Sequence, residues 1–493
     1  MYNTRLIQIL KSFSPKEMRE FGKFVTSPFY NTNKKVEQLY NIIKKHYPKF
    51  KPRTIKLNKI FNTLYPGSKS NNGIIRNLFS ELSLLAENYL VITDYKQDKF
   101  DYQKRLMTQL NIRKLDNMFE KGLEKAFILL DQEKIKDENH YLRHYMLETL
   151  KCEYFLARTP VGKSLPLYQN RKNMIDQFMH NFLITMLKEY FDMHNAEGLL
   201  KFEHQHVFFE EIMNHLSRHK KEYNKIVLID ILYRFILLYR NNEEMGAEDE
   251  LKELIESSKD QISYYDYRNF MLELYNYYKD KRAEGNINYG TKSFELMNDM
   301  LKNGIFYQMD GHISSHTFIN LVSAALLEKQ IDWAENFNNQ YKDKLPVDQR
   351  ESAFLFSYAN IHYIRGAQSN PKLKSKHFNK ALDYLAKVKS EDFYYMSRIK
   401  NMLARIYYDL NEIEHAISIV GSYKKFLSKS KSIPENLYEQ YYNFITFVYK
   451  LIKFKTGTSK ITPEQLKDEI ISTQLLAYRG WLLEKVTEFD TYE

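Results

Sequence analysis

Turn-forming residues are scarce in this chain, which has only 15 glycines and 11 prolines among its 493 residues. An all-β fold needs a tight turn at each hairpin, and glycine and proline supply the backbone geometry of most such turns. Apolar side chains instead recur every three or four residues over long stretches, which is the spacing of one face of an α-helix. The sequence therefore predicts an all-α protein.

The length argues against a single compact helical core. Hydrophobic residues make up 43% of the chain and charged residues 27%, a composition typical of globular proteins. One hydrophobic core stops growing at about 250–300 residues, well short of this length. We therefore expect either several domains or one extended array of stacked helix pairs.

No feature of the sequence indicates secretion or a membrane span. The single cysteine, Cys152, can form neither an internal disulfide nor a cysteine-based zinc site. The N-terminal apolar run is too short for a signal peptide. The longest apolar stretch, residues 226–239, contains Asp230 and Arg234 and is shorter than the roughly 20 residues of a membrane span. We expect a cytoplasmic protein without a membrane partner.

The positive charge of the chain lies at its N-terminal end. Residues 1–100 contain 18 Lys and Arg but only 7 Asp and Glu, a net charge of +11 that equals the formal charge of the whole chain. Short helices are expected here, one of them opened by a capping box in which Ser14 and Glu17 flank Pro15. The sequence predicts a basic N-terminal helical domain over residues 1–95.

One stretch of this domain is a candidate polyanion-binding site. Seven basic residues fall within 16 positions that contain no acid, and His46, Tyr47 and Phe50 are interleaved with them. Positive charge suits phosphate groups, and aromatic rings suit base stacking. The alternatives are a surface that binds an acidic protein and a solvated lysine-rich surface. The seven candidates are Lys44, Lys45, Lys49, Lys51, Arg53, Lys56 and Lys59.

Internal similarity appears late in the chain. Residues 358–363 (YANIHY) match residues 403–408 (LARIYY), and each copy precedes a second helix with alanine at an equivalent place, Ala381 or Ala416. A weaker third copy covers residues 321–325 and leads to Ala334. Small residues at helix crossings and this pairing resemble tetratricopeptide repeats, most clearly between about residues 260 and 430. The resemblance implies a solenoid of stacked antiparallel helix pairs.

The expected organisation beyond the basic domain has three parts. Residues 100–260 form helix pairs of uncertain repeat type, residues 261–462 form tetratricopeptide-like repeats, and residues 463–493 form one C-terminal capping helix. Repeat units are expected to start near residues 222, 264, 314, 348, 393 and 434. Five tyrosine doublets suit this architecture if one ring of each faces the core and the other the surface.

Two groups of motifs are weak candidates for a nucleotide-binding site and for a metal site. Residues 157–164 (ARTPVGKS) match a loose phosphate-binding loop and residues 226–230 look like a Walker B strand, but both neighbourhoods have helical patterns and Pro166 follows the first. Three histidine pairs have the spacing of four that suits a metal on a helix. They are His140/His144, His215/His219 and His312/His316. None forms a His-Glu-x-x-His motif, so we expect no catalytic residue, metal or cofactor.

The expected function is therefore binding. The leading hypothesis is a non-enzymatic scaffold or adaptor that holds a protein or peptide on the solenoid surface, while the basic domain engages an acidic partner. The alternative is a nucleic-acid-binding regulator in which the basic domain contacts DNA or RNA and the solenoid serves as a sensor or partner-binding module.

Overall fold

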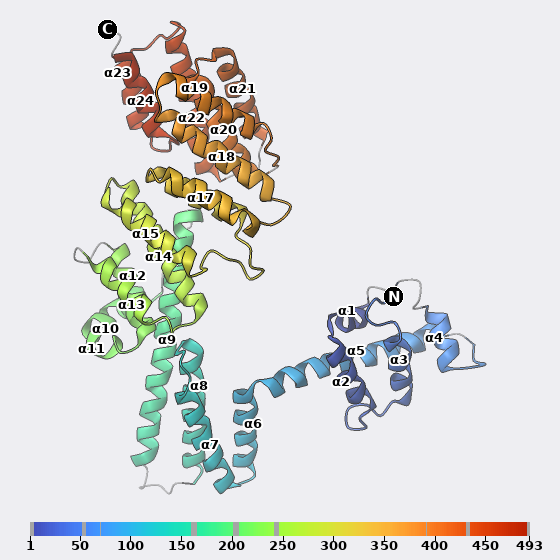
Figure 1. The fold of residues 1–493 in the computed structure, drawn as a ribbon. Coiled ribbons are helices and arrows are strands. Elements are labelled where there is room, and N and C mark those ends of the chain that lie inside the picture. The colour runs from blue at the N-terminus through green and yellow to red at the C-terminus, as the bar shows by residue number, and fades with distance from the viewer. Residues whose placement is uncertain are drawn as a thin grey trace. The chain divides into compact units, whose positions relative to one another are not determined.

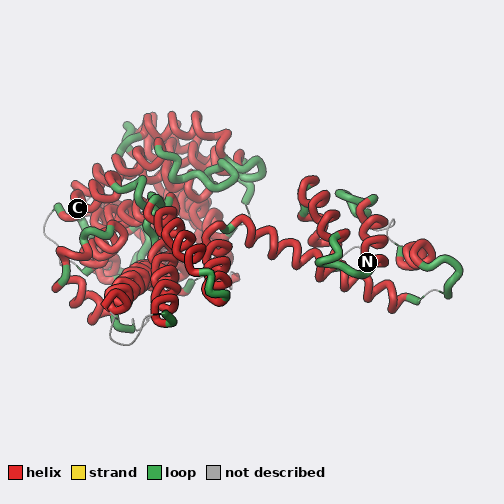
Figure 2. Tube along the Cα trace, turned by 90° about the horizontal axis from the view of Figure 1, so that it is seen from below, coloured by secondary structure: helices red, strands yellow, loops and turns green. Residues whose placement is uncertain are grey.

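The computed structural model describes residues 4–51, 56–69, 71–158, 165–200, 207–240, 246–390, 392–429 and 434–490. These residues form 24 α-helices and one short 3-10 helix, and their only β-type pairing is an isolated bridge between Tyr307 and Ile313. Figure 2 shows helices joined by loops along the described part of the trace. The predicted all-α class is confirmed. Within the described parts, no helix combines the length and apolarity that a bilayer crossing requires.

The chain divides into two compact units, residues 1–186 and 187–493. The boundary lies inside helix α9 (Leu165–Leu200), so the region expected as one block over residues 100–260 is shared between the units. In the first unit, helices α1 to α4 pack on the long helix α5 (Figure 1). Their bounds are α1 Arg5–Ser12, α2 Pro15–Thr26, α3 Lys34–Lys44, α4 Leu57–Leu64 and α5 Asn72–Gln97.

The core of these five helices is aromatic. Phe21 is fully buried and meets Tyr40 edge-on at 5.4 Å between ring centroids. The Tyr40 hydroxyl donates a hydrogen bond to the Met18 carbonyl at 2.6 Å, which ties α3 to α2. The capping box predicted at Ser14 is present and starts α2.

The rest of the first unit is a group of longer helices. Asp98 ends α5 and caps the next helix, since its side chain accepts from the Asp101 amide. Three helices then pack on one another around a core that includes Phe119 and Tyr154, whose rings stack at 4.4 Å. Their bounds are α6 Lys99–Ile112, α7 Asp116–Asp131 and α8 Glu138–Leu156.

The second unit is a succession of helices in which each helix from α12 to α22 packs on its neighbour in sequence, and α24 packs on both α22 and α23 (Figure 1). In the later part, α16 also packs on α18 and α20 on α22, which are the first helices of successive pairs. The bounds are α10 Phe209–Arg218, α11 Lys220–Tyr223, α12 Val227–Tyr239, α13 Ala247–Ser257, α14 Tyr264–Ala283, α15 Asn288–Lys302, α16 Ser315–Leu327, α17 Ile331–Tyr341, α18 Arg350–Ala367, α19 Pro371–Leu385, α20 Phe393–Asp409, α21 Ile413–Lys429, α22 Glu435–Lys455, α23 Pro463–Ser472 and α24 Arg479–Asp490.

The expected repeat units coincide with helix pairs. Helices α14, α16, α18, α20 and α22 begin within two residues of the starts predicted from the sequence, and α12 begins five residues after the first one. The alanines expected at helix crossings, Ala334, Ala381 and Ala416, are fully buried on the second helices. Small side chains at these positions allow the paired helices to approach each other closely.

Two expectations about this unit were wrong. The final segment is two helices, α23 and α24, because the chain turns at Tyr478, which has a positive φ of 54°. The Arg479 guanidinium holds that turn by donating to the carbonyls of Ile471 and Thr473. The doublet Tyr264–Tyr265 is exposed on both sides, since it starts α14 and extends past the packed part of the helix. The other four doublets place one ring inward.

Candidate functional site

The candidate polyanion-binding residues lie around the connection between α3 and α4. Six of the seven are described and all six are exposed, namely Lys44, Lys45, Lys49, Lys51, Lys56 and Lys59. Arg53 lies outside the described residues. Among the described residues, no carboxylate forms an ion pair with five of these lysines, namely Lys44, Lys45, Lys49, Lys56 and Lys59; the ion pair of Arg5 with Glu87 lies in the same group of helices. These six exposed lysines together are the basic surface of this domain.

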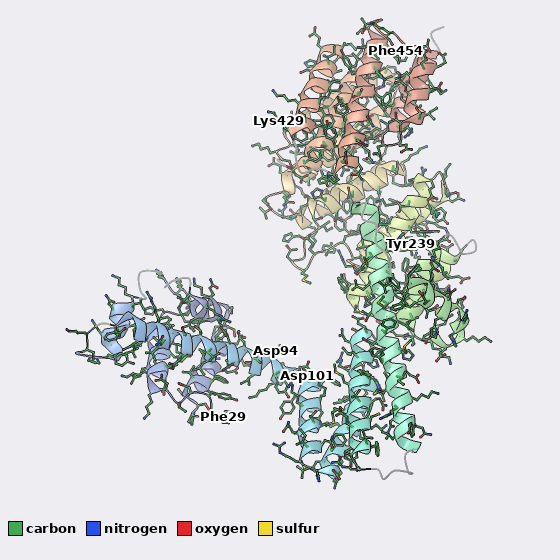
Figure 3. The ribbon with its side chains drawn as sticks, turned by 180° about the vertical axis from the view of Figure 1, so that it is seen from behind. Phe29, Asp94, Asp101, Tyr239, Lys429 and Phe454 are labelled. Atoms are coloured by element: carbon green, nitrogen blue, oxygen red, sulfur yellow. The ribbon has the colours of Figure 1, made fainter. Side chains whose placement is uncertain are left out.

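The aromatic residues interleaved with these lysines do not face the solvent as base stacking would require. Phe50 is fully buried in the core of α1 to α5. Tyr47 is partly buried, and its hydroxyl donates to the Phe13 carbonyl at 2.7 Å. The most exposed aromatic among the described residues of this domain is Phe29, which is 86% exposed in the connection between α2 and α3. It lies at the other end of α3, at the edge of these helices (Figure 3). The basic surface therefore offers charge but not stacking.

The motifs that resemble a nucleotide-binding site do not assemble one. Residues 159–164 lie outside the described part of the chain, and α8 runs up to Leu156, where a phosphate-binding loop requires a strand. Residues 227–230 belong to α12, and Asp230 pairs with Arg234 one turn later at 3.1 Å. The carboxylate thus has a structural partner within its own helix.

The histidine pairs are engaged with neighbouring side chains. His140 bonds to Glu133 and His144 to Asp131, at 3.1 and 3.2 Å. Burial is the main cause of the lowered pKa of His144. In the second pair, His215 lies 2.9 Å from the Tyr223 hydroxyl.

The third pair is not on one helix, contrary to the expectation from its spacing. His312 precedes α16 and lies 3.3 Å from Asp310, whereas His316 is in the first turn of that helix. In the part of the chain that the structure describes, no group of three or more His, Cys, Asp or Glu is arranged to hold a metal ion.

The second unit contains a groove formed by the first helices of successive pairs. One cavity of about 880 Å³ lies along α14 and α16 and is lined by Arg268, Tyr275, Thr317 and Glu328 among others. A second cavity of about 370 Å³ lies along α16, α18 and α20. Ser323 and Leu327 line both cavities, so the two form one groove across four helices. Leu327 is 67% exposed there.

Two arginines of α20 dominate the smaller cavity. The Arg398 guanidinium reaches across to α16, where it donates to Asn320 Oδ1 at 2.9 Å and to Ser323 Oγ at 2.7 Å. Arg405 lies two turns later, with its guanidinium carbon 4.6 Å from the Tyr363 ring centroid and 4.1 Å from that of Tyr478. Burial lowers the pKa of Arg398.

Sequence reasoning missed this groove, although the aligned repeat copies contain a signal for it. The residue that directly follows the helix-crossing position is Ser323, Asn360 or Arg405 in the three copies, and all three line the smaller cavity. A polar residue next to a buried small or apolar one therefore marks the groove side of each first helix.

No model of a known protein family matches the chain, and no curated protein matches it significantly.

Proposed function

We propose that this chain is a non-enzymatic helical-repeat adaptor. Its second unit acts as a degenerate tetratricopeptide-like solenoid that binds a protein or peptide partner. The observation that carries the proposal is the continuous groove along α14, α16, α18 and α20. The single cysteine fits a reducing compartment, so we also propose a cytoplasmic location.

The groove has the mixed character that peptide binding requires. Apolar contact is available at Leu327, which is 67% exposed where the two cavities join. Neutral hydrogen-bonding side chains such as Asn320 and Asn360 lie on its walls. An extended segment gains affinity from apolar anchors in such clefts and specificity from a few placed polar groups.

The test is affinity purification with the full chain and with two variants that each introduce an arginine. Leu327→Arg places a long charged side chain in the groove, and we expect it to lose the partners that the wild type retains. Ile417→Arg is the matched control, because Ile417 is 46% exposed on the second helix α21 and does not line either cavity. Equal recovery with both variants would contradict binding in the groove.

A second candidate function, nucleic-acid binding by the N-terminal domain, has one specific observation in its favour. Five exposed lysines around the α3–α4 connection have no carboxylate contact among the described residues, namely Lys44, Lys45, Lys49, Lys56 and Lys59. Phosphate contacts of this kind give binding that weakens steeply with salt and has little sequence preference. Because the neighbouring aromatics are in the core, we propose contact with the phosphate backbone and not with bases.

Fluorescence anisotropy with labelled duplex DNA and single-stranded RNA tests this second candidate. We expect the double variant Lys44→Glu/Lys45→Glu to weaken binding. The slope of log K against the logarithm of the salt concentration should become shallower by about 2 to 4. The matched control is Lys425→Glu/Lys429→Glu, which makes the same charge change at two exposed lysines of α21. The absence of binding at low salt would exclude the candidate.

A further inference from the structure

Charge is distributed unevenly along the groove. The larger cavity is lined by three cations and two carboxylates, and one pair of these, Arg282 and Glu328, lies 3.2 Å apart. The smaller cavity is lined by Lys329, Arg398 and Arg405, and none of its lining residues is Asp or Glu. The α20 end of the groove is therefore positive, and its charge is not balanced by the residues that form it.

Among the described residues, the Arg398 guanidinium has only neutral hydrogen-bond partners. Its two hydrogen bonds go to an amide oxygen and a hydroxyl oxygen, and its guanidinium carbon lies 5.6 Å from the Phe356 ring centroid. No carboxylate of the described chain pairs with it. A partly buried cation has lost some hydration, so an oxyanion that reaches it gains a charge-assisted hydrogen bond stronger than those it now makes.

Arg405, like Arg398, has only neutral hydrogen-bond partners among the described residues. Its Nε donates to the Asn401 carbonyl at 3.3 Å, and its remaining contacts with the described chain are with the rings of Tyr363 and Tyr478. The acid that follows one turn later, Asp409, is engaged elsewhere. Its carboxylate lies 3.1 Å from the Lys485 ammonium and is only 5% exposed. It is not available to neutralise the cavity.

The walls between the two arginines are apolar. Leu326, Phe356 and Met402 line the cavity, and each is at most 5% exposed. The two arginines are seven residues apart on α20, which corresponds to about 10 Å along a helix. This is the spacing of the two backbone positions, and both side chains are long enough to turn toward one group of a peptide seated between them beside these apolar residues.

We infer that the groove selects a peptide segment bearing an oxyanion next to an apolar side chain, with the oxyanion bound by Arg398 and Arg405. The oxyanion is a side-chain carboxylate or a phosphate on a modified residue, because a guanidinium fork binds either one with two parallel hydrogen bonds. This inference rests on the proposed peptide-binding function and adds the chemistry of the partner.

The experiment uses the full chain and fluorescent peptide pools with degenerate flanks and one defined central residue. The central residues are Glu, phosphoserine, Gln, Ser and Lys. We expect the Glu or phosphoserine pool to bind at least about 10-fold more tightly than its neutral counterpart, Gln or Ser, and the Lys pool to bind most weakly. The ratio between the Glu and phosphoserine pools then identifies which oxyanion the site prefers.

Three variants connect this selectivity to the site. Arg398→Met and Arg405→Met keep most of the side-chain volume but remove the charge. Each should weaken the acidic pools about 10-fold or more, to near the affinity of the neutral pools, which should change little. Arg218→Met is the matched control, because Arg218 is exposed on α10 and lines neither cavity. Arg398→Lys retains the charge without the fork and distinguishes charge from geometry, and circular dichroism checks that each variant is folded.

The outcomes separate the two levels of the proposal. Binding of neutral and acidic pools with equal affinity, unchanged in Arg398→Met and Arg405→Met, would overturn the oxyanion inference and leave peptide binding intact. Failure of every pool to bind would overturn both. Loss of the preference for acidic pools in the two arginine variants, with the preference retained in Arg218→Met, would support the inference.

Discussion

The Nδ1 atoms of His362 and His377 lie 2.9 Å apart, which joins α18 to α19 through two imidazoles. One ring must donate a proton and the other must accept it, so this contact requires at least one neutral histidine. Burial is the first cause that lowers the pKa of His362 to about 4, and His377, Lys380 and Arg365 add to it while Glu335 opposes them. Burial also lowers the pKa of His377.

This pair predicts a loss of stability in weak acid. The unfolded chain binds a proton at each histidine below about pH 6.5, whereas folded His362 resists protonation until about pH 4, so the free energy of unfolding falls as pH decreases through this window. We expect a decrease of about 1–2 kcal/mol between about pH 7 and pH 5, measured by urea unfolding. His362→Gln should remove this part of the decrease. His415→Gln, at an exposed histidine, should leave it unchanged.

A pair of glycine substitutions tests the close packing of α18 on α19. A Cβ atom on Gly366 would lie 2.6 Å from two ring carbons of buried Phe378, so Gly366→Ala should destabilise the protein by about 1–2 kcal/mol. Gly421 is also helical but has nothing within 4 Å of such a Cβ. Gly421→Ala should therefore stabilise by up to about 1 kcal/mol through helix propensity. The melting temperature should therefore fall for Gly366→Ala and rise for Gly421→Ala. A higher melting temperature for Gly366→Ala would contradict the close packing of α18 on α19.

A buried ion pair near the end of the chain gives a third prediction. Asp409 and Lys485 lie 3.1 Å apart with side chains 5% and 4% exposed. Burial opposes the charge of Lys485, but Asp409 and two neighbouring glutamates offset it and raise the pKa of the ammonium. Lys485→Met leaves Asp409 buried with Lys374 at 3.8 Å, and we expect a loss of about 2–4 kcal/mol in unfolding experiments. Lys425→Met, at an exposed lysine of α21, should change stability by less than about 0.5 kcal/mol.

The contact between α2 and α3 supports a double-mutant cycle. A Cβ on Gly22 would lie 2.9 Å from the Tyr40 hydroxyl oxygen, which is held in place by the Met18 carbonyl. Gly22→Ala should cost about 1–2 kcal/mol in the wild type and less when Tyr40→Phe is present, because the obstructing oxygen is then absent. Tyr40→Phe alone should cost about 1 kcal/mol. Strict additivity of the two changes would show that the side chains do not meet.

The sequence predicted local features of this molecule well because they depend on neighbouring residues. The capping box at Ser14, the starts of the first helices and the burial of Ala381 and Ala416 all follow from spacing along a helix. The break at Tyr478 was not predictable in this way, because a repeating apolar pattern does not reveal that a single residue adopts a positive φ.

Features that depend on distant contacts were not predicted. Phe50 follows three lysines and a proline, a context that looks solvent-exposed, yet the chain folds back and buries the ring in the core. Arg398 bonds to residues 75 and 78 positions earlier, a separation that no local pattern reports. The candidate groove could be recognised only after the structure showed that Ser323, Asn360 and Arg405 share one cavity.

Arg398 has a consequence for how this protein can change over evolutionary time. Its side chain fills the space between α20 and α16 and also carries the charge of the cavity between them. Under the proposed binding role, a change at Arg398 must satisfy two requirements at once, the contact between α20 and α16 and the charge of the cavity. A change at the exposed Leu327 affects the groove alone, so that position has fewer constraints on its variation.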